Sequence, residues 1–569
     1  FKQKTAYEIM PSLVGSEMCI RDSFWGNVYT FNKRNALNIV LVRIRYHIKQ
    51  PSGWPPGTPT LVPTVTPTVL VPPKGTGLRG KYYTQQTYPV AHVECWFPKA
   101  RDTMDFKGDL STRKGWDELL SKVNSLAVHT KHPAGVFKWY GLIPNLHGAL
   151  RGGLLGLAHV SGRAAIGYGG DTMAHELGHN FDRGHAPCGG PGGVDPNFPD
   201  PQGRIQEFGF DPDTQRVYDP ARTYDFMSYC GPDWISPYTF KGLYHKIGGP
   251  RTQVTGSSGM MEEQDYLLIS MEIDREANTG QLHEAYVDAR PVGTDDDVGE
   301  GPYRLELQDA QGAVLFTRYF DPVVIPFSAA PSYSDEPFTF WLEVLPFPVG
   351  TQRIVLLHEE QVLDSREVSA NAPVVTVEYP NGGEALSGTV EVRWSGSDSD
   401  GDSLVYTLQY SIDGGKTWSA VDVDLTDTSY TLDTEAMAGT TQGKIRVLAS
   451  DGVNTTADES DGVFSVPKKP PEAYIIWPQS GQAFEHQEMV LLRGMAYDPE
   501  DGPLGDEAYT WSSDLDGDLG MGEEILVPEL SPGWHEITLT ATDSDGNSAT
   551  DTIRVYVGHR TYLPMLVRR

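Results

Sequence analysis

Two hydrophobic patterns divide the chain. In the first part, short apolar runs alternate with stretches in which apolar residues recur every three or four positions, a combination typical of strands and helices in one domain. The runs Asn38–Ile48, Val90–Phe97 and Val136–Ile143 predict strands. Leu78–Gln86 and Trp116–Val128 predict helices. We therefore expect a mixed α/β (α+β) domain in this part of the chain.

Two further segments of the first part are less regular. Leu154–Tyr168 is apolar, contains several glycines and comes directly before a helical stretch, so we expect it to be the edge strand of the sheet. An extended peptide could pair with such an edge by adding one strand. Pro51–Pro73 is rich in Pro, Thr and Val and should be extended and irregular. We favour a long loop within the domain over a linker before it.

From about Glu262 onward, short alternating segments separated by turns predict an all-β region. A first β-sandwich is expected over residues 262–371, and two further modules over 372–467 and 468–558. These two modules repeat each other and resemble bacterial immunoglobulin-like or fibronectin-like modules. The strands expected in the first sandwich are Tyr303–Leu307, Val314–Tyr319, Phe338–Leu345 and Ile354–His358. The residues that recur between the two repeated modules are Pro373, Pro380 and Gly383, matched by Pro471, Pro478 and Gly481.

Both ends of the chain are set apart from this organisation. Lys2–Glu8 and Leu13–Asp22 match the translations of sequencing-library adapters. We interpret residues 1–23 as a sequencing-adapter artefact and exclude them from the fold. The true N-terminus, with any signal peptide or propeptide, is therefore expected to be missing. Residues 559–569 are expected to form a C-terminal tail.

Composition narrows the partners that this chain can have. Its 569 residues carry a formal charge of −31, with a pI near 4.8. Such acidity argues against nucleic acids and anionic membranes as partners, and favours divalent cations. No apolar run approaches the roughly 18 residues needed to span a membrane.

The chemistry is concentrated in Asp171–His185, which reads DTMAHELGHNFDRGH. His175 and His179 are four residues apart and lie on one face of a helix, so both can reach one metal ion. Glu176 lies beside them and can reach a water on that metal without being a ligand. If the chain turns back sharply after the helix, His185 supplies a third imidazole. Three imidazoles with an open fourth position are typical of a catalytic zinc site, whereas a surface helix that carries three histidines is the alternative.

This pattern resembles that of the metzincin zinc peptidases, in which a third histidine and a Met-turn follow the helix. The resemblance covers roughly Asn35–Gly249, within a catalytic domain expected at residues 24–261. Tyr224–Tyr229 resembles the Met-turn, which implies that Met227 lies beneath the metal as an apolar floor. It also implies that Tyr229 is an extra ligand or a donor to the transition state. The chain departs from the family at Asp182, where the metzincins have glycine.

The departure at Asp182 carries a structural expectation. Metzincin glycine at this position is expected to be left-handed, which lets the helix end and the third histidine swing towards the metal. Asp tolerates positive φ better than most residues, because its short side chain can hydrogen-bond the local backbone. We therefore predict positive φ at Asp182, with no role in binding zinc, and we predict Asp171 as the N-cap of the helix.

Two of the four cysteines flank the predicted zinc site. Cys188 follows the third histidine by three residues, and Cys230 follows Tyr229 directly. We interpret them as a disulfide, with two buried free thiols as the alternative. Cys95 lies in an apolar segment and is expected to be a core thiol, while Cys19 belongs to the adapter segment.

These features together predict a secreted or surface-attached zinc endopeptidase, with Glu176 as general base and Tyr229 assisting, acting on a protein or peptide substrate. The β-modules could bind a surface or matrix ligand. Their acidic turns Asp398–Asp402 and Asp514–Asp518 could bind calcium, and solvated turns are the alternative that the sequence leaves open. The rival function is an adhesin with an inactive peptidase-like head, against which the intact Glu176 counts.

Overall fold

The computed structural model describes residues 20–21, 28–29, 36–47, 69–130, 136–144, 154–160, 162–211, 216–248, 265–288, 299–322, 324–328 and 338–558. Most of the predicted adapter segment, Pro51–Thr68 and the tail 559–569 therefore lie outside the described residues. The chain divides into two compact units, Phe1–Val466 and Pro467–Arg569. Among the described residues, no helix has the length and apolarity that a membrane span requires.

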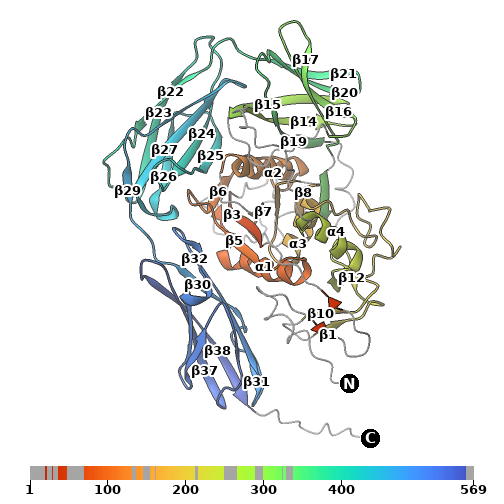
Figure 1. Ribbon diagram of the computed structural model, residues 1–569, viewed down its shortest axis with the longest axis vertical. Coiled ribbons are helices and arrows are strands. Elements are labelled where there is room, and N and C mark those ends of the chain that lie inside the picture. The colour runs from red at the N-terminus through yellow and green to blue at the C-terminus, as the bar shows by residue number, and fades with distance from the viewer. Residues whose placement is uncertain are drawn as a thin grey trace, which may run out of the picture. The chain divides into compact units, whose positions relative to one another are not determined.

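The first unit contains a mixed eight-stranded sheet in the order β18-β8-β9-β7-β3-β4, with β5 and β6 also paired to β3. Its strands β3, β5, β6, β7 and β8 are labelled in Figure 1. The strands β5, β6 and β7 run parallel to β3, and β9 runs parallel to β7. The antiparallel pairs are β3 with β4, β8 with β9, and β8 with β18. The bounds of the eight strands are β3 (Leu37–His47), β4 (Val69–Leu70), β5 (Val93–Trp96), β6 (Thr103–Phe106), β7 (Val136–Leu142), β8 (Leu154–His159), β9 (Ala164–Gly167) and β18 (Val324–Ser328).

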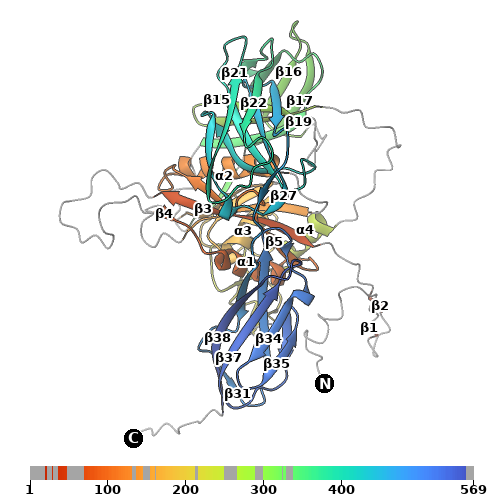
Figure 2. The ribbon, with the colours of Figure 1, turned by 90° about the vertical axis from the view of Figure 1, so that its left-hand side faces the viewer.

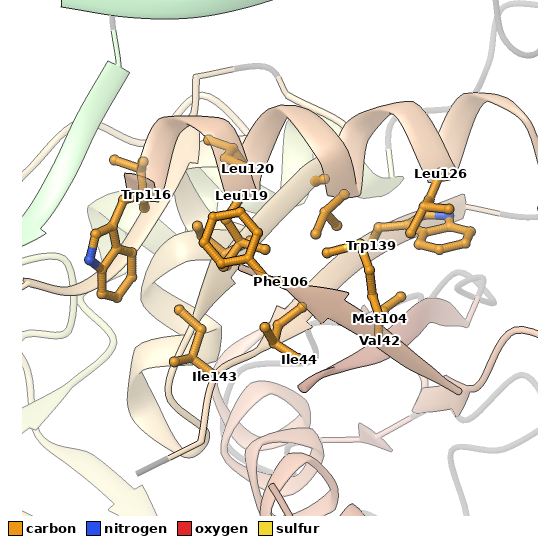
Figure 3. Packing of buried hydrophobic residues seen from close by; sticks show 14 of the residues in the cluster. Val42, Ile44, Met104, Phe106, Trp116, Leu119, Leu120, Leu126, Trp139 and Ile143 are labelled. Atoms are coloured by element: carbon orange, nitrogen blue, oxygen red, sulfur yellow. The ribbon is translucent and has the colours of Figure 1, made fainter. Parts of the chain in front are cut away.

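Helices cover both faces of this sheet, because the central strand β3 is apolar on both sides. Its residues Val42 and Ile44 pack with α2 (Arg113–Val128) in one core, where Leu119 and Leu120 point towards the strands (Figure 3). On the other face, Leu41 contacts α1 (Lys74–Thr87) so closely that a Cβ at Gly77 would lie 2.9 Å from it. Successive β3 side chains thus serve opposite layers, which is the expected behaviour of a buried strand in a mixed sheet.

The expectations for this first part are largely confirmed. The strands β3, β5 and β7 and the helices α1 and α2 all fall where the apolar patterns predicted them. The expectation for Leu154–Tyr168 was wrong: this stretch forms two antiparallel strands, β8 and β9, and β8 is not at the edge of the sheet. The outer side of β8 is taken by β18, which comes from far along the chain. Local sequence could not reveal this partner.

The predicted first sandwich contributes two sheets of its own. One has the order β15-β14-β19 and the other β17-β16-β20-β21. Four of its strands match those predicted, while β14, β15, β18 and β21 were not predicted. The bounds are β14 (Tyr266–Asp274), β15 (Thr279–Asp288), β16 (Tyr303–Gln308), β17 (Val314–Phe320), β19 (Phe338–Pro346), β20 (Arg353–His358) and β21 (Gln361–Glu367).

The module over 372–466 packs against the mixed-sheet part of the same unit. Its Ala420 and Val423 share a core with α2. Lys122 of α2 pairs with Asp422 at 2.9 Å, and buried Gln409 donates to the carbonyl of His129 at 2.8 Å. Its two sheets have the order β22-β23-β26 and β25-β24-β27-β28, with β29 also paired to β27. The bounds are β22 (Val374–Tyr379), β23 (Thr389–Ser397), β24 (Val405–Ser411), β25 (Ser419–Leu425), β26 (Ser429–Asp433), β27 (Thr440–Ser450), β28 (Thr455–Glu459) and β29 (Phe464–Val466).

The second unit is a further β-sandwich, built around Trp511, Leu492 and Leu539. Its five-stranded sheet has the order β31-β38-β37-β34-β35, in which β37 and β38 form a long hairpin (Figure 2). The other sheet contains β30, β32, β33 and β36. The bounds are β30 (Glu472–Trp477), β31 (Ala483–Glu485), β32 (Val490–Asp498), β33 (Gly502–Pro503), β34 (Tyr509–Ser513), β35 (Gly517–Met521), β36 (Glu524–Val527), β37 (Gly533–Thr542) and β38 (Ser548–Gly558).

Candidate metal centre

Three histidines converge at the helix α3 (Asp171–Asn180) and the turn that follows it. His175 and His179 lie on α3, and His185 lies beyond its end. Their ligand-capable ring nitrogens all lie within 4.8 Å of one another, and the Nε2 atoms of His175 and His185 are 3.2 Å apart. The structure therefore brings together the three residues that the spacing predicted.

Each imidazole is oriented by a backbone carbonyl. The Nδ1 of His175 donates to the carbonyl of Phe226 at 2.8 Å, and that of His179 donates to Arg183 at 2.6 Å. His185 Nδ1 hydrogen-bonds to the carbonyl of Gly192. Because Nδ1 carries the proton in all three rings, each Nε2 presents a lone pair, and such outer hydrogen bonds are what orients histidine ligands of metal ions.

The cluster is buried and electrically suited to a cation. His179 and His185 are 0% exposed, and His175 is 2% exposed. Burial lowers the pKa of His179 to about 4 and holds the pKa values of His175 and His185 well below their ordinary range. His179 Nε2 has no hydrogen-bond partner among the described residues. Three neutral nitrogens aimed at one point, one of them unsatisfied, fit a zinc ion.

Asp182 makes the turn that allows His185 to return. Its φ is +61°, so the prediction of a left-handed residue here is confirmed. The N–H of Arg183 donates to the carbonyl of Gly178 at 3.0 Å, and that of Asp182 donates to His179 at 2.9 Å. This pair of bonds is the Schellman motif, which normally uses glycine at the left-handed position. The carboxylate of Asp182 pairs with Lys246 of α4 (Pro237–Gly248) rather than facing the histidines.

The start of α3 differs from the prediction. Its N-cap is Gly170, with φ +79° and no capping side chain, so the assignment of Asp171 as N-cap was wrong. Asp171 instead occupies the first helical position, where its carboxylate accepts from the N–H of Thr172 at 2.8 Å. An acidic side chain in the first turn still favours the helix dipole. The error is one residue, within the usual uncertainty of a helix boundary.

The segment Tyr224–Tyr229 packs against α3. Met227 is buried, and a Cβ at Gly178 would lie 2.6 Å from its sulfur, so this glycine lets the methionine approach the helix. The carbonyl of Met227 accepts from the N–H of Ala186 at 3.0 Å. The backbone just after His185 is therefore hydrogen-bonded to the segment that lies below the helix.

Asp225 organises this segment, a role that sequence reasoning missed. Its buried carboxylate accepts from the N–H of Met227 at 2.8 Å and from that of Ser236 at 2.9 Å. Burial raises the pKa of Asp225, and these two donors partly oppose the rise. Asp225 belongs to the segment that resembles the Met-turn, but only the structure shows that its hydrogen bonds to Met227 and Ser236 hold this turn in place.

A disulfide closes the same region. Cys188 and Cys230 are bonded, with a Cα–Cα distance of 5.7 Å, so this prediction is confirmed. The N–H of Tyr229 also donates to the carbonyl of Cys188 at 3.1 Å. Tyr229 lies with its ring centroid 4.9 Å from that of His185, which places it beside the cluster. Cys95 is buried, as expected for a core thiol.

Glu176 directly follows His175 on α3 and is shielded from solvent. It is 0% exposed, and neither carboxylate oxygen has a hydrogen-bond partner among the described residues. Burial raises its pKa, which the positive charge of Arg113 partly opposes. A Cβ at Gly156 of β8 would lie 2.6 Å from Glu176 Cγ, so this glycine provides the space that the glutamate fills. An unsatisfied buried carboxylate on the helix that carries two potential metal ligands is suited to general base chemistry.

Helix α3 is held in place by side chains to which the sequence assigned no role. Asn180 donates to the carbonyls of His159 and Ala164, at 2.9 and 3.1 Å, and so ties α3 to β8 and β9. The hydroxyl of Tyr88 donates to the carbonyl of Ala174 at 2.7 Å. These contacts fix the helix relative to the sheet.

A second group of potential ligands lies far from the histidines in sequence. Asp398, Asp402 and Asp451 offer carboxylate oxygens within 4.8 Å of one another, at the predicted acidic turn Asp398–Asp402. Calcium at this turn stays a prediction. Asp514–Asp518, the other predicted turn, forms no comparable group among the described residues.

No family model and no curated protein matches this chain. Among solved structures it is similar to the fibronectin(III)-like modules of Clostridium thermocellum CbhA, with 17% identity over 33% of this chain and 95% of that chain, at a TM-score of 0.15. It is also similar to the four N-terminal Ig domains of Dscam1 isoform 7.44, with 11% identity over 45% of this chain and 65% of that chain, at a TM-score of 0.19. These neighbours agree with the β-sandwich modules, but scores this low carry no argument, and the modules are established by their own strand pairing.

Proposed function

We propose that the chain is a zinc-dependent endopeptidase, secreted or attached to a surface. The observation that carries this proposal is the set of three imidazoles whose Nδ1 atoms are all bonded to backbone carbonyls, so that their Nε2 atoms converge beside Glu176. The resemblance of the helix and Met-turn segments to the metzincins supports the same reaction class. The disulfide and the β-sandwich modules are compatible with an extracellular location.

His175, His179 and His185 would hold the zinc ion through Nε2. When bound, zinc supplies a Lewis acid that lowers the pKa of a water to about 7 and polarises a carbonyl oxygen. Glu176 accepts a proton from the water that attacks the peptide carbonyl and then donates it to the departing amine nitrogen. Tyr229 lies beside His185 and donates its hydroxyl proton in a hydrogen bond to the developing oxyanion.

The test is zinc analysis combined with hydrolysis of an unfolded protein by the wild type and by Glu176→Gln. Glutamine has nearly the same shape but cannot take the proton. We expect unchanged zinc content and a loss of about 10²–10⁴-fold in kcat, the range for removal of a general base. Hydrolysis by Glu176→Gln at the wild-type rate would refute the mechanism. A wild type that binds zinc but hydrolyses no peptide bond would favour a binding protein instead.

A further inference from the structure

The strand β18 leaves the sandwich from which it comes. It lies between β17 and β19 in sequence, yet it belongs to neither sheet of that sandwich, β15-β14-β19 or β17-β16-β20-β21. Instead, it runs antiparallel along β8 and completes the mixed sheet. It also contacts α3, the helix that carries His175, Glu176 and His179. A strand from one domain thus reaches the candidate metal centre of another.

The strand with which β18 pairs is the one that lies over Glu176. Gly156 of β8 provides the space for the glutamate side chain, and β9 takes one side of β8. On the other side, Gly156 pairs with Phe327 of β18, and Leu157 pairs with Pro326. The backbone of β18 therefore occupies the open side of β8 at the residue nearest the proposed base.

This side of β8 is where an extended peptide would bind. Peptides that add a strand to a sheet use its unpaired edge, and β18 already uses the edge of β8 in the antiparallel sense. In the same structure Glu176 and His179 are both 0% exposed. The proposed base is therefore shielded from solvent while β18 is paired with β8, although a scissile carbonyl must come within about 3 Å of the groups that act on it.

We propose that β18 is a built-in occluding strand, which takes the place of a substrate on β8 and keeps the proposed peptidase latent until it is displaced. This inference rests on the proposed function. Substrate and β18 compete for one edge, so the apparent activity is reduced by the fraction of molecules in which β18 is paired.

The pairing is well suited to reversal. β18 has only five residues, and Pro326 at its centre has no N–H to give to the ladder. The register also shifts between Phe327 and Ser328. Because β18 belongs to neither sandwich sheet, its departure from β8 removes no strand from them.

The experiment weakens the pairing in the full zinc-loaded chain. Ile325→Pro with Phe327→Pro leaves no backbone N–H from residue 325 to residue 327. Ile325→Val with Phe327→Tyr is the matched control, since it keeps both N–H groups. Two readouts are taken together: amide hydrogen exchange at Leu154–His159, which needs no activity, and kcat/KM on an unfolded protein. We expect faster exchange in β8 and a rise of about tenfold or more in kcat/KM for the proline variant alone.

The outcomes separate the two proposals. Unchanged exchange in β8 overturns the occluding strand, and so does faster exchange without a gain in kcat/KM over an active wild type. If exchange in β8 becomes faster but neither the wild type nor the proline variant hydrolyses the substrate, the proposed function is refuted. The proposal that β18 keeps the enzyme latent is then refuted as well.

Two further arms keep the test decisive if the proline variant misfolds. Val324–Ser328 replaced by Gly-Ser-Gly-Ser-Gly keeps the length and the N–H groups but disfavours a strand, so it should also release β8. A synthetic peptide with the sequence of Pro322–Ser328 should inhibit this variant and restore slow exchange in β8. If the peptide neither inhibits this variant nor slows exchange in β8 at concentrations up to millimolar, the proposal is contradicted.

Discussion

In the part of the chain that the structure describes, two places gather three potential metal ligands, and they differ in how the ligands are oriented. At His175, His179 and His185 the side chains are buried and each ring is turned by a backbone carbonyl. At the aspartate group of Asp398, Asp402 and Asp451 the residues are half-buried or exposed. The first arrangement leaves the Nε2 atom of His179 without a hydrogen-bond partner among the described residues, whereas the second lies where water can satisfy it.

The aspartates are also largely occupied by their own turns. Asp398 Oδ1 accepts from the N–H of Asp400 at 2.8 Å, and Asp451 Oδ1 accepts from Asn454 at 2.8 Å. Ser369 donates to Asp402 at 2.5 Å. Of the carboxylate oxygens in this aspartate group, only Asp398 Oδ2 is both shielded from solvent and without a hydrogen-bond partner among the described residues. Convergence alone therefore does not distinguish the two groups, whereas the orientation of the ligand atoms and their unused hydrogen-bonding capacity do.

The largest effect should come from removing one side chain of the histidine group. The matching change in the aspartate group should have no effect on zinc binding. His179→Ala should lower zinc affinity by more than about 100-fold, which is the upper end for the loss of a single outer-shell hydrogen bond. Asp402→Asn should leave zinc affinity unchanged, and it serves as the matched control. Zinc content after dialysis against a weak chelator measures both. Equal zinc retention by the two variants would contradict the prediction that the histidine group holds zinc and the aspartate group does not.

The next effect concerns what holds the histidine cluster together. Replacing Cys188 and Cys230 by Ser should cost about 4 kcal/mol at most, from the loop of 42 residues that the disulfide closes. Because the bridge ties the segment after His185 to the Met-turn segment, zinc retention should fall along with the melting temperature. Mass spectrometry of the unreduced wild type checks the bond itself. A variant with wild-type zinc retention would show that the hydrogen bonds of this region suffice.

A smaller effect is expected at Asp182. Asp182→Val should destabilise the protein by about 1–2 kcal/mol, because a β-branched residue is strained at positive φ. Asp182→Gly should be nearly neutral, since relief of strain offsets the loss of a partly exposed ion pair with Lys246. Urea denaturation of the zinc-loaded proteins compares the two. Equal stability of the Val and Gly variants would mean that this turn does not depend on backbone conformation.

The smallest effect is expected from calcium. If the aspartate group binds it, millimolar calcium should raise the melting temperature of the zinc-loaded wild type, and Asp402→Asn should abolish the rise. Added calcium is preferable to a chelator here, because chelators also remove zinc. If calcium leaves the melting temperature unchanged, this turn is a solvated loop and not a calcium site. The aspartate group would then differ from the histidine group in metal binding as well.

The candidate site could be predicted well because its information is local. The spacing of His175, Glu176 and His179 follows from helix geometry alone, and Asp182 could be assigned positive φ from its chemistry and its place after the helix. The neighbours of Cys188 and Cys230 pointed to the disulfide. The role of Asp225 was not predicted, because it depends on which N–H groups lie around its carboxylate. These N–H groups come from residues 2 and 11 positions away.

The sequence by itself indicated many of the strands and helices, because hydrophobic period and turn chemistry act over a few residues. Only the tertiary structure decided which strands meet. No local signal says that β18 pairs with β8, or that Gln409 donates to His129 across 280 positions. Strand pairing joins backbone groups that every residue possesses, so the sequence of one strand barely specifies its partner. That choice is made by the whole fold, and here it places β18 beside β8, the strand whose Gly156 leaves space for Glu176.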